Sequence, residues 1–580
     1  DYLKAESVMD TLPVLQVGAV GLISTQDQPA SGIPPNAWNV AKNVRFSSAK
    51  VEAGKGWASA GTVTITGTAR LLDFVAGGLS TWWLMFSDTA IHSVTGGYLN
   101  NDVTRASGPY TSGDWVATNF QGVPVATNNA DLPQTQFVSG GIPVETTLFQ
   151  DLPNWPAGDR CRIIASLRNF LVAADVTESG TRYRTMIRWS NAAAPGNLPA
   201  DWAVADPTSL ANQIILGTGR GGVVAVYPLR DSLIVYREEG VGVLEYVGGN
   251  LVMRYRDVTD QWGAQAPQAV VPLPTGVHLV FTKNDVFLFD GQGHRSVAKD
   301  RTQQLLAGFA DIRQDKANDF RVRLYDAYSE VWIGLPAESG LIEEVWVYNY
   351  REDHWAGPRQ VPSLRDFQYL PILDVESKIN LQLSWEQAAV TPGLQLWTNW
   401  NEIPWNAVSR TTLVGAFGFF GVGNTGLLYR LDYGFDSPGV SEYQSRLVRQ
   451  DVDLVGDESI ATVVAIYPTV SISGLSETIT PLRWNEISLI AGATWNSPDW
   501  SQRTWNEFQG AATPLQITVG SHEAAGNIPT WREPSTYQPG GYKGTTKARG
   551  RRHAIEITSA SVQWALSSYK WEFDVAGRAQ

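Results

Sequence analysis

A glycine-rich segment is the first part of the chain whose residue types could do chemistry. Gly217, Gly219 and Gly222 satisfy the G-x-G-x-x-G spacing of a dinucleotide-binding loop. The residues that follow, 223–229, read VVAVYPL and predict a strand. A pyrophosphate needs the N-terminus of a helix at that point, because unpaired backbone N–H groups hold it there. We therefore interpret the segment as a turn.

Two pairs of adjacent glutamates could in principle act as an acid and a base. Glu238 and Glu239 follow a predicted strand, and Glu343 and Glu344 begin one. Neighbouring side chains on a strand point to opposite faces, so neither pair forms a ready dyad. No zinc-protease, nucleophile-elbow or P-loop motif occurs, and the six histidines are scattered along the chain. We predict no enzyme and no catalytic, cofactor-binding or metal-binding residues.

Tryptophan followed by asparagine recurs in three segments, 398–408, 483–487 and 493–508. The asparagine can form an Asx turn while the indole covers apolar surface. Exposed tryptophans of this kind could anchor a protein partner or form a carbohydrate platform. We favour the structural interpretation, in which they cap strand ends, because no acidic or amide pattern completes a sugar site. A propeller-type protein that binds or degrades glycans stays the alternative function.

The net charge bears on whether the protein binds nucleic acid. The net charge of −13 argues against a protein that grips DNA, which needs clustered basic residues. One segment is different, because five basic residues and no acidic ones lie within it: Lys543, Lys547, Arg549, Arg551 and Arg552. This segment could be a nucleic-acid or lipid patch. We favour a loop that forms an interface with an acidic neighbouring subunit or adaptor.

The elements that position these residues are predicted to be strands. With 580 residues the chain is too long for one hydrophobic core, and 43% hydrophobic residues can fill several. Only 17% of residues are charged, while 54 glycines, 31 prolines and 23 tryptophans indicate many turns between aromatic strands. A single convincing helix is expected at 300–311. Cys161 lies in an apolar run and is expected to be buried and inert.

The order of strands predicts a divergent β-propeller. Strand groups of similar build recur at 166–191, 223–248, 277–297 and 328–355, each with paired strands, a turn and an aromatic strand. We divide the chain into an N-terminal segment, 1–60, that packs on a C-terminal β domain, 431–580, with a propeller-like region carrying long loop insertions, 61–430, between them. The class is all-β. The longest apolar stretch, 413–422, is too short to span a bilayer as a helix.

The most informative stretch is PPNAWNVAKNVRFSSAKVEAGKGW, residues 34–57. We expect Asn36 to cap a short turn, and 44–46 and 50–52 to form a hairpin. We also expect Trp38 and Trp57 to be buried in a domain built from the two chain ends. The residues with a structural role in this stretch are Pro35, Asn36, Trp38, Asn43, Val44, Arg45, Gly56 and Trp57.

This stretch resembles the N-terminal signature of the tail nozzle (tail tubular protein B-like) proteins of short-tailed bacteriophages, the podoviruses. Further resemblance lies in the Trp-Ser and Pro-rich segment 186–202, the paired aromatic strands of 330–355, and the closing strands of 548–578. The individual matches are patterns of aromatic strands. Their order along the chain carries most of the specificity.

The resemblance implies a structural protein of the virion tail. Such a protein forms a homohexameric ring, attached to the tail adaptor ring, that retains the genome and passes double-stranded DNA during ejection. Its distal tip meets the host cell envelope, and tail fibres are a further candidate partner. We expect closure of the conduit to be steric. Our candidates for the gate are the Gly-, Asn- and Thr-rich connection at 96–141, which reads as a long loop, and the apolar segment with Phe417, Phe419 and Phe420. We prefer the first, because the second alternates with glycine as a buried strand would.

Overall fold

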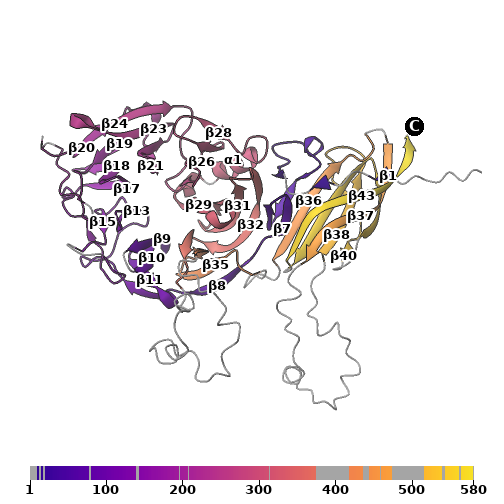
Figure 1. Ribbon diagram of the computed structural model, residues 1–580, viewed down its shortest axis with the longest axis horizontal. Helices are drawn as coiled ribbons and strands as arrows, with labels where there is room; N and C mark the ends of the chain where they lie inside the picture. Colours follow the sequence, from indigo (N-terminus) through magenta and orange to yellow (C-terminus); the bar gives the residue numbers. More distant parts are fainter. Residues whose placement is uncertain are drawn as a thin grey trace, which may run out of the picture.

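In the computed structural model, a seven-bladed β-propeller lies beside a two-sheet β-sandwich (Figure 1). The described residues are 10–11, 15–16, 20–77, 80–138, 143–194, 196–204, 206, 208–312, 314–373, 417–434, 443–456, 459–472, 515–537, 543–560 and 563–578. The predicted class, an all-β propeller with a β-rich domain built from both chain ends, is confirmed. The Trp-Asn segments 398–408, 483–487 and 493–508 lie outside the described residues.

The first three blades are antiparallel four-stranded sheets formed by consecutive strands. Blade 1 comprises β9 (Ala69–Gly77), β10 (Ser80–Ser87), β11 (Ile91–Thr95) and β12 (Leu99–Asp102). Blade 2 comprises β13 (Val116–Phe120), β14 (Val123–Thr127), β15 (Gln134–Thr135) and β16 (Gln150–Asp151). Blade 3 comprises β17 (Arg160–Leu167), β18 (Phe170–Glu178), β19 (Thr181–Trp189) and β20 (Asn212–Ile215).

The next three blades follow the same plan, and the four strand groups predicted from the sequence are those of blades 3 to 6. Blade 4 comprises β21 (Val223–Leu229), β22 (Ser232–Arg237), β23 (Gly240–Gly248) and β24 (Val252–Thr259). Blade 5 comprises β25 (Val270–Pro272), β26 (His278–Phe281), β27 (Val286–Phe289) and β28 (His294–Ser296). Blade 6 comprises β29 (Arg321–Tyr325), β30 (Glu330–Pro336), β31 (Ile342–Asn349) and β32 (His354–Leu364).

Blade 7 joins distant parts of the chain. Its inner strands are β33 (Asp366–Pro371), β34 (Phe417–Val422) and β35 (Leu427–Leu431), and its outer strand is β8 (Trp57–Thr62), which pairs with β35. The N-terminal region therefore closes the ring of blades. A separate apolar cluster lies between each pair of neighbouring blades up to blade 5, and another between blades 7 and 1. The largest cluster continues from blades 5 to 7 into the sandwich.

The sandwich is continuous with blade 6. Its first sheet is reached from β32 through β5 and comprises β5 (Val40–Lys42), β36 (Gln444–Val452), β42 (Arg552–Ala560), β38 (Leu515–His522), β39 (Thr530–Trp531) and β40 (Ser535–Tyr537). The second comprises β41 (Gly544–Gly550), β37 (Ser459–Ile472), β43 (Trp564–Arg578), β7 (Lys50–Ala53) and β6 (Val44–Ser47), with β1 (Asp10–Thr11) and β2 (Leu15–Gln16) on β43. Short parallel pairs join β3 (Gly21–Leu22) to β32 and β4 (Ala37–Trp38).

Helical structure is sparse among the described residues. The helix expected at 300–311 is α1 (Gln303–Ile312). The 3-10 segments are η1 (Ala30–Gly32), η2 (Gly96–Tyr98), η3 (Thr218–Arg220), η4 (Gly249–Leu251), η5 (Gln314–Asp319) and η6 (Asp326–Tyr328). The glycine-rich turn is confirmed, because η3 leads directly into strand β21. Within the described part of the chain, no helix has the length and apolar character needed to cross a membrane.

Two local predictions were wrong. The connection at 96–141 is not a long loop, because it supplies the outer strand of blade 1 and the first three strands of blade 2. Three of its aromatic residues, Tyr110, Trp115 and Phe120, fill the cores on either side of that blade. Its polar residues make the turns, as where Asn119 Oδ1 accepts from the N–H of Gly122 at 2.8 Å. The described residues of 96–141 are therefore blade structure and not the long loop that was expected.

The second correction concerns the start of the signature. The residues after Asn36 do not form a helical turn but two short strands, β4 and β5, because each finds a partner strand in the assembled fold. Pro35 and Asn36 are the central residues of a β-turn, in which the N–H of Ala37 donates to the carbonyl of Pro34 at 3.0 Å. The predicted hairpin is present as β6 and β7.

Candidate functional site

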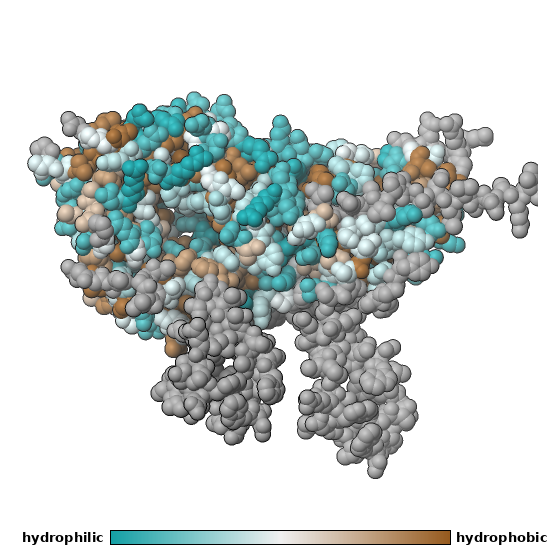
Figure 2. All heavy atoms as spheres, in the orientation of Figure 1, coloured by the Kyte–Doolittle hydropathy of each residue, from teal (hydrophilic) through white to brown (hydrophobic). Residues whose placement is uncertain are grey.

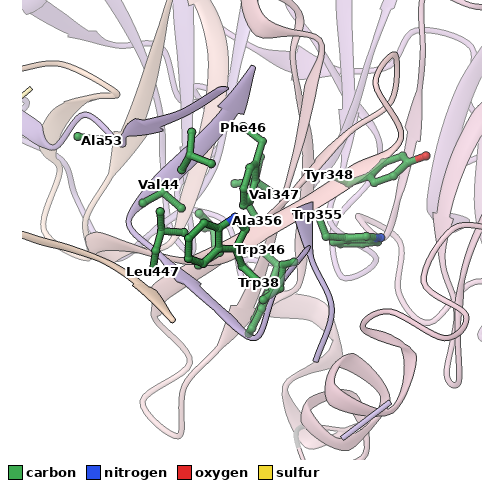
Figure 3. Packing of buried hydrophobic residues seen from close by; sticks show 14 of the residues in the cluster. Trp38, Val44, Phe46, Ala53, Trp346, Val347, Tyr348, Trp355, Ala356 and Leu447 are labelled. Atoms are coloured by element: carbon green, nitrogen blue, oxygen red, sulfur yellow. The ribbon is translucent and has the colours of Figure 1, made fainter. Parts of the chain in front are cut away.

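The residues of the N-terminal signature lie at the joint between propeller and sandwich (Figure 3). Trp38 is 1% exposed, and its ring centroid lies 6.0 Å from that of Tyr569 on β43. Trp57 is also buried and meets Tyr443 edge-on at 5.7 Å. Both tryptophans therefore pack against the C-terminal part of the chain, as predicted. Val44 is buried in the same cluster.

Asn43 connects strands from both halves of the molecule. It has a left-handed backbone, with φ of 52°, which asparagine tolerates better than most residues. Its side-chain Nδ2 donates to the carbonyl of Gln444 on β36 at 2.8 Å and to Oε1 of Gln360 on β32 at 3.0 Å. Its Oδ1 accepts from the N–H of Gln360 at 2.8 Å. One fully buried amide thus fixes β32 to β36.

Arg45 is the centre of a buried network of charges. Its guanidinium donates to both carboxylate oxygens of Glu330, at 2.5 and 2.9 Å, and to Asp432 Oδ2 at 3.0 Å. The second oxygen of Asp432 accepts from Arg359 at 3.1 Å. Tyr328 stacks on Arg45, with 3.7 Å between the guanidinium carbon and the ring centroid.

The network balances two guanidinium groups against two carboxylates, so no net charge is buried. Burial alone would raise the pKa of Asp432, but Arg45 and Arg359 outweigh it and hold that pKa below its usual range. Burial likewise opposes the charge of Arg45, but Asp432 and Glu330 raise its pKa well above the ordinary value. Each charge is therefore stable only while its partners are present.

Gly54 allows the backbone to pass close to this network. A Cβ at Gly54 would lie 2.8 Å from the carbonyl oxygen of Asn43 and 3.0 Å from a nitrogen of Arg359. Gly56 forms backbone hydrogen bonds with Tyr433 and Gly434 at 3.0 Å, which leads the chain into β8. The signature therefore holds the joint together and starts the strand that closes blade 7.

The basic segment is a strand, not the loop predicted from the sequence. Lys547 and Arg549 are exposed on β41, which is an edge of the second sandwich sheet. Lys543 is exposed just before it, and Arg551 is partly exposed just after it. Arg552 does not belong to this exposed group, because it is only 8% exposed and forms an ion pair with Asp453 at 3.5 Å. Exposed basic side chains on an edge strand also discourage indiscriminate strand pairing.

A cavity of about 670 Å³ lies on the propeller axis, where the first strands of all seven blades meet. Figure 2 shows the propeller face hollowed at this place. The walls are mainly aliphatic and aromatic. A smaller polar space adjoins the cavity, and Arg162 on β17 is hydrogen-bonded there to Asn318, which donates to Asp114 at 3.2 Å. This polar network joins blade 3, the 3-10 segment η5 and the residues before β13.

Sequence reasoning missed the partners of Arg45 and the whole of the axial cavity. Glu330 and Asp432 are 285 and 387 residues away from Arg45, so local spacing could not connect them. One usable signal was present, because Glu330 begins an otherwise apolar strand in which every residue is buried. Among the described residues, no three His, Cys, Asp or Glu side chains are placed to hold a metal ion.

The fold defines a β-propeller protein with an attached sandwich, and comparison with known proteins adds little to this. No family model matches the sequence, and no curated protein matches it. Among solved structures, the extracellular domain of the putative hybrid two component system BT3049 from B. thetaiotaomicron is similar over 51% of this chain and 37% of its own, with 10% identity and a TM-score of 0.28.

Two further solved structures are similar to a comparable extent. The computationally designed Ika8 protein matches 52% of this chain and 93% of its own, with 11% identity and a TM-score of 0.27. YCF48 from Cyanidioschyzon merolae matches 64% of this chain and 98% of its own, with 10% identity and a TM-score of 0.32. Similarities this low carry no argument about function. The propeller assignment rests on the strand pairing of the chain itself.

Proposed function

We propose that this chain is a structural virion protein, the subunit of a tail nozzle ring that retains and conducts DNA in a short-tailed bacteriophage. The observation that supports this most is the role of the N-terminal signature. The residues that carry the resemblance make one buried joint, in which Trp38, Asn43 and Arg45 each contact strands from the distant half of the chain. A shared signature of this kind belongs to a scaffold, where its residues are needed for architecture.

In this proposal the DNA passes between subunits and not along the propeller axis. A cavity of about 670 Å³ has the size of a small-molecule pocket, which is too small for a DNA duplex. The conduit would therefore be the centre of a ring of several copies. With a net charge of −13 per copy, its wall would on average repel the phosphate backbone and let a duplex slide.

A cyclic ring needs two different complementary patches on each subunit. The edge strand β41 supports the proposal as one of them, because Lys547 and Arg549 project from an exposed edge of an otherwise acidic chain. The tail adaptor ring is the other candidate partner for this strand. The glycan-active alternative depends on the Trp-Asn segments, which lie outside the described residues, and on acidic or tyrosine side chains at the propeller centre.

The direct test is electron microscopy of purified protein and of tailed particles that carry it, with this chain labelled by a bound antibody fragment. The expected result is a ring at the distal end of the tail, with six-fold symmetry in class averages. Native mass measurement of the detached ring gives the copy number independently. A monomer at the tail tip, two-fold symmetry, or a label elsewhere on the particle would overturn the proposal.

A further inference from the structure

The buried charges around the axial cavity balance one another. Arg323 lines the cavity and donates to both oxygens of Asp366 at 3.0 and 3.1 Å, and Arg321 Nε lies 3.3 Å from the same carboxylate. The second carboxylate is that of Asp73, which also lines the cavity and accepts from the N–H of Phe74 at 2.8 Å. Two guanidinium groups therefore balance two carboxylates. A charged ligand would find no surplus counter-charge in this wall.

Other polar groups of the wall are also hydrogen-bonded within the protein. Asp326 lies at the exposed rim and accepts from the hydroxyl of Tyr350 at 3.1 Å. The hydroxyl of Tyr227 donates to the carbonyl of Pro267 at 2.9 Å, and Gln268 Oε1 accepts from the Arg323 guanidinium at 2.8 Å. These groups have little capacity left for a ligand.

Three neutral polar side chains of the wall remain available. Thr118, Gln368 and Tyr369 are partly buried, and within the described part of the chain none of them makes a side-chain hydrogen bond. Hydroxyl and amide groups that are withdrawn from water are normally hydrogen-bonded. These three groups can therefore donate to, or accept from, a molecule that fills the cavity.

Most of the wall is apolar, and one aromatic ring in it is incompletely covered. Phe417 on β34 is 41% exposed, although its ring meets those of Tyr369 at 5.2 Å and Phe74 at 5.9 Å. Aliphatic residues from the other blades complete the surface. An apolar molecule in this space would remove the ring and the aliphatic surface from water, which favours binding.

We propose that the axial cavity binds a neutral, mainly apolar small molecule, an aromatic or alicyclic compound with hydrogen-bonding groups and no ionised group. Its body would cover Phe417 and the aliphatic strands, and its polar groups would meet Thr118, Gln368 or Tyr369. An ionised ligand is disfavoured, because it would lose its hydration without gaining an unpaired counter-ion. This inference goes beyond the nozzle proposal and does not depend on it.

Two fluorescent probes with the same ring system test the proposal on the full chain. N-phenylnaphthylamine is neutral, its counterpart anilinonaphthalene sulfonate is an anion, and both fluoresce strongly only in apolar surroundings. The titrations are made in about 0.5 M NaCl, which screens the overall charge of the chain. We expect the neutral probe to saturate at one molecule per chain and to bind at least about tenfold more tightly than the sulfonate. Equal affinities, tighter binding of the sulfonate, or no saturable binding of the neutral probe would overturn the proposal.

Paired variants assign the binding to the cavity. Phe417→Ala removes the exposed ring and should weaken the neutral probe at least several-fold. Gln368→Glu keeps the shape but places a charge in the wall, and should weaken it as much. The matched controls are Ile528→Ala, at a side chain 90% exposed in the sandwich, and Gln292→Glu, at an exposed residue between β27 and β28, and both should leave binding unchanged. Parent-like binding by both cavity variants would place the probe elsewhere and refute the proposal. The comparison of the two probes on the parent chain decides it even if a cavity variant does not fold.

Discussion

A single residue, Arg45, shows how this fold ties distant segments together. Its contacts to Glu330 and Asp432 replace the water that its charge loses on burial. A buried ion network of this kind adds little stability over an apolar core of the same shape, but removing one partner is costly. The network therefore acts mainly to specify one arrangement of β6, β30 and β35, and it makes that arrangement sensitive to single substitutions.

The first prediction concerns Asp432. Asp432→Asn keeps the shape of the side chain but leaves Arg45 and Arg359 with only one carboxylate between them. The free energy of unfolding should fall by about 3–5 kcal/mol, as measured by urea denaturation at pH 7. Asp231→Asn, at an exposed position, should stay within about 0.5 kcal/mol of the parent. Parent-like stability of Asp432→Asn would show that the network is not needed at the joint.

The second prediction concerns pH and His278. This side chain is fully buried, and its Nε2 donates to the carbonyl of Pro228 at 2.9 Å while Nδ1 accepts from the hydroxyl of Tyr236 at 2.8 Å. Both nitrogens of the neutral ring are therefore hydrogen-bonded, and a proton on Nδ1 would displace the bond from Tyr236. Burial lowers its pKa to about 4, although the Pro228 carbonyl opposes the shift.

The folded chain therefore resists protonation of His278 over a range in which the unfolded chain accepts it. Stability should fall as pH drops below about 6.5 and level off near 4. Between pH 7 and 5 this residue should account for about 2 kcal/mol. His278→Gln should flatten the profile by that amount in urea titrations. Tyr236→Phe loses a hydrogen bond and should keep the slope. A His278→Gln profile parallel to that of the parent would refute this.

At the scale of elements, what the sequence could predict depended on distance along the chain. Strands of blades 3 to 6 were predicted because pattern and turns act within about ten residues. The pairing of β8 with β35 was beyond such reasoning, since it joins Trp57 to Leu431. The same holds for β5, which links β32 to β36. Blade 2 was misread as a loop because several of its buried positions hold polar residues, among them Thr127, Gln134 and Thr135.

The boundaries drawn at 60 and 430 stay predictions, and strand pairing runs across them. Both fall inside strands of the same blade, β8 and β35. The signature residues were found because the resemblance pointed to them. The partners of these residues and the axial cavity were not found from the sequence, because only the closed ring of blades brings the residues concerned together.

The third prediction concerns β41 as an interface. Lys547 and Arg549 are exposed at an edge, so Lys547→Glu with Arg549→Glu should leave the subunit folded. If the strand meets an acidic neighbour, the reversal should abolish assembly of rings, measured by native mass spectrometry, while the thermal unfolding of the subunit stays the same. Lys283→Glu with Lys299→Glu, the same charge change at two exposed residues outside the sandwich, is the matched control. Normal assembly of the β41 variant would remove this strand from the interface.

At the scale of the whole molecule, the propeller and the sandwich behave as one unit. The main core runs from blades 5 to 7 into the sandwich, β5 is shared by both, and buried polar groups of Asn43 and Arg45 cross the joint. A subunit built this way would permit little relative movement between its propeller and its sandwich. In a nozzle, opening would then come from displacement of whole subunits or of loops. The shape and charge of the conduit wall would be those of the surface of each rigid subunit.

The last prediction concerns the conduit of the proposed ring. If the assembled ring conducts double-stranded DNA without gripping it, its affinity for a short duplex should be weak and should change little with salt. A protein that neutralises several phosphates instead loses about 10³-fold or more in affinity between 50 and 200 mM salt. Fluorescence anisotropy of a labelled duplex, titrated with rings across that range, measures this. Subunits carrying Lys547→Glu and Arg549→Glu report whether any residual binding comes from β41. Tight binding with a steep salt dependence in the parent ring would contradict the conduit, because a duplex held by counterion release could not pass rapidly through it.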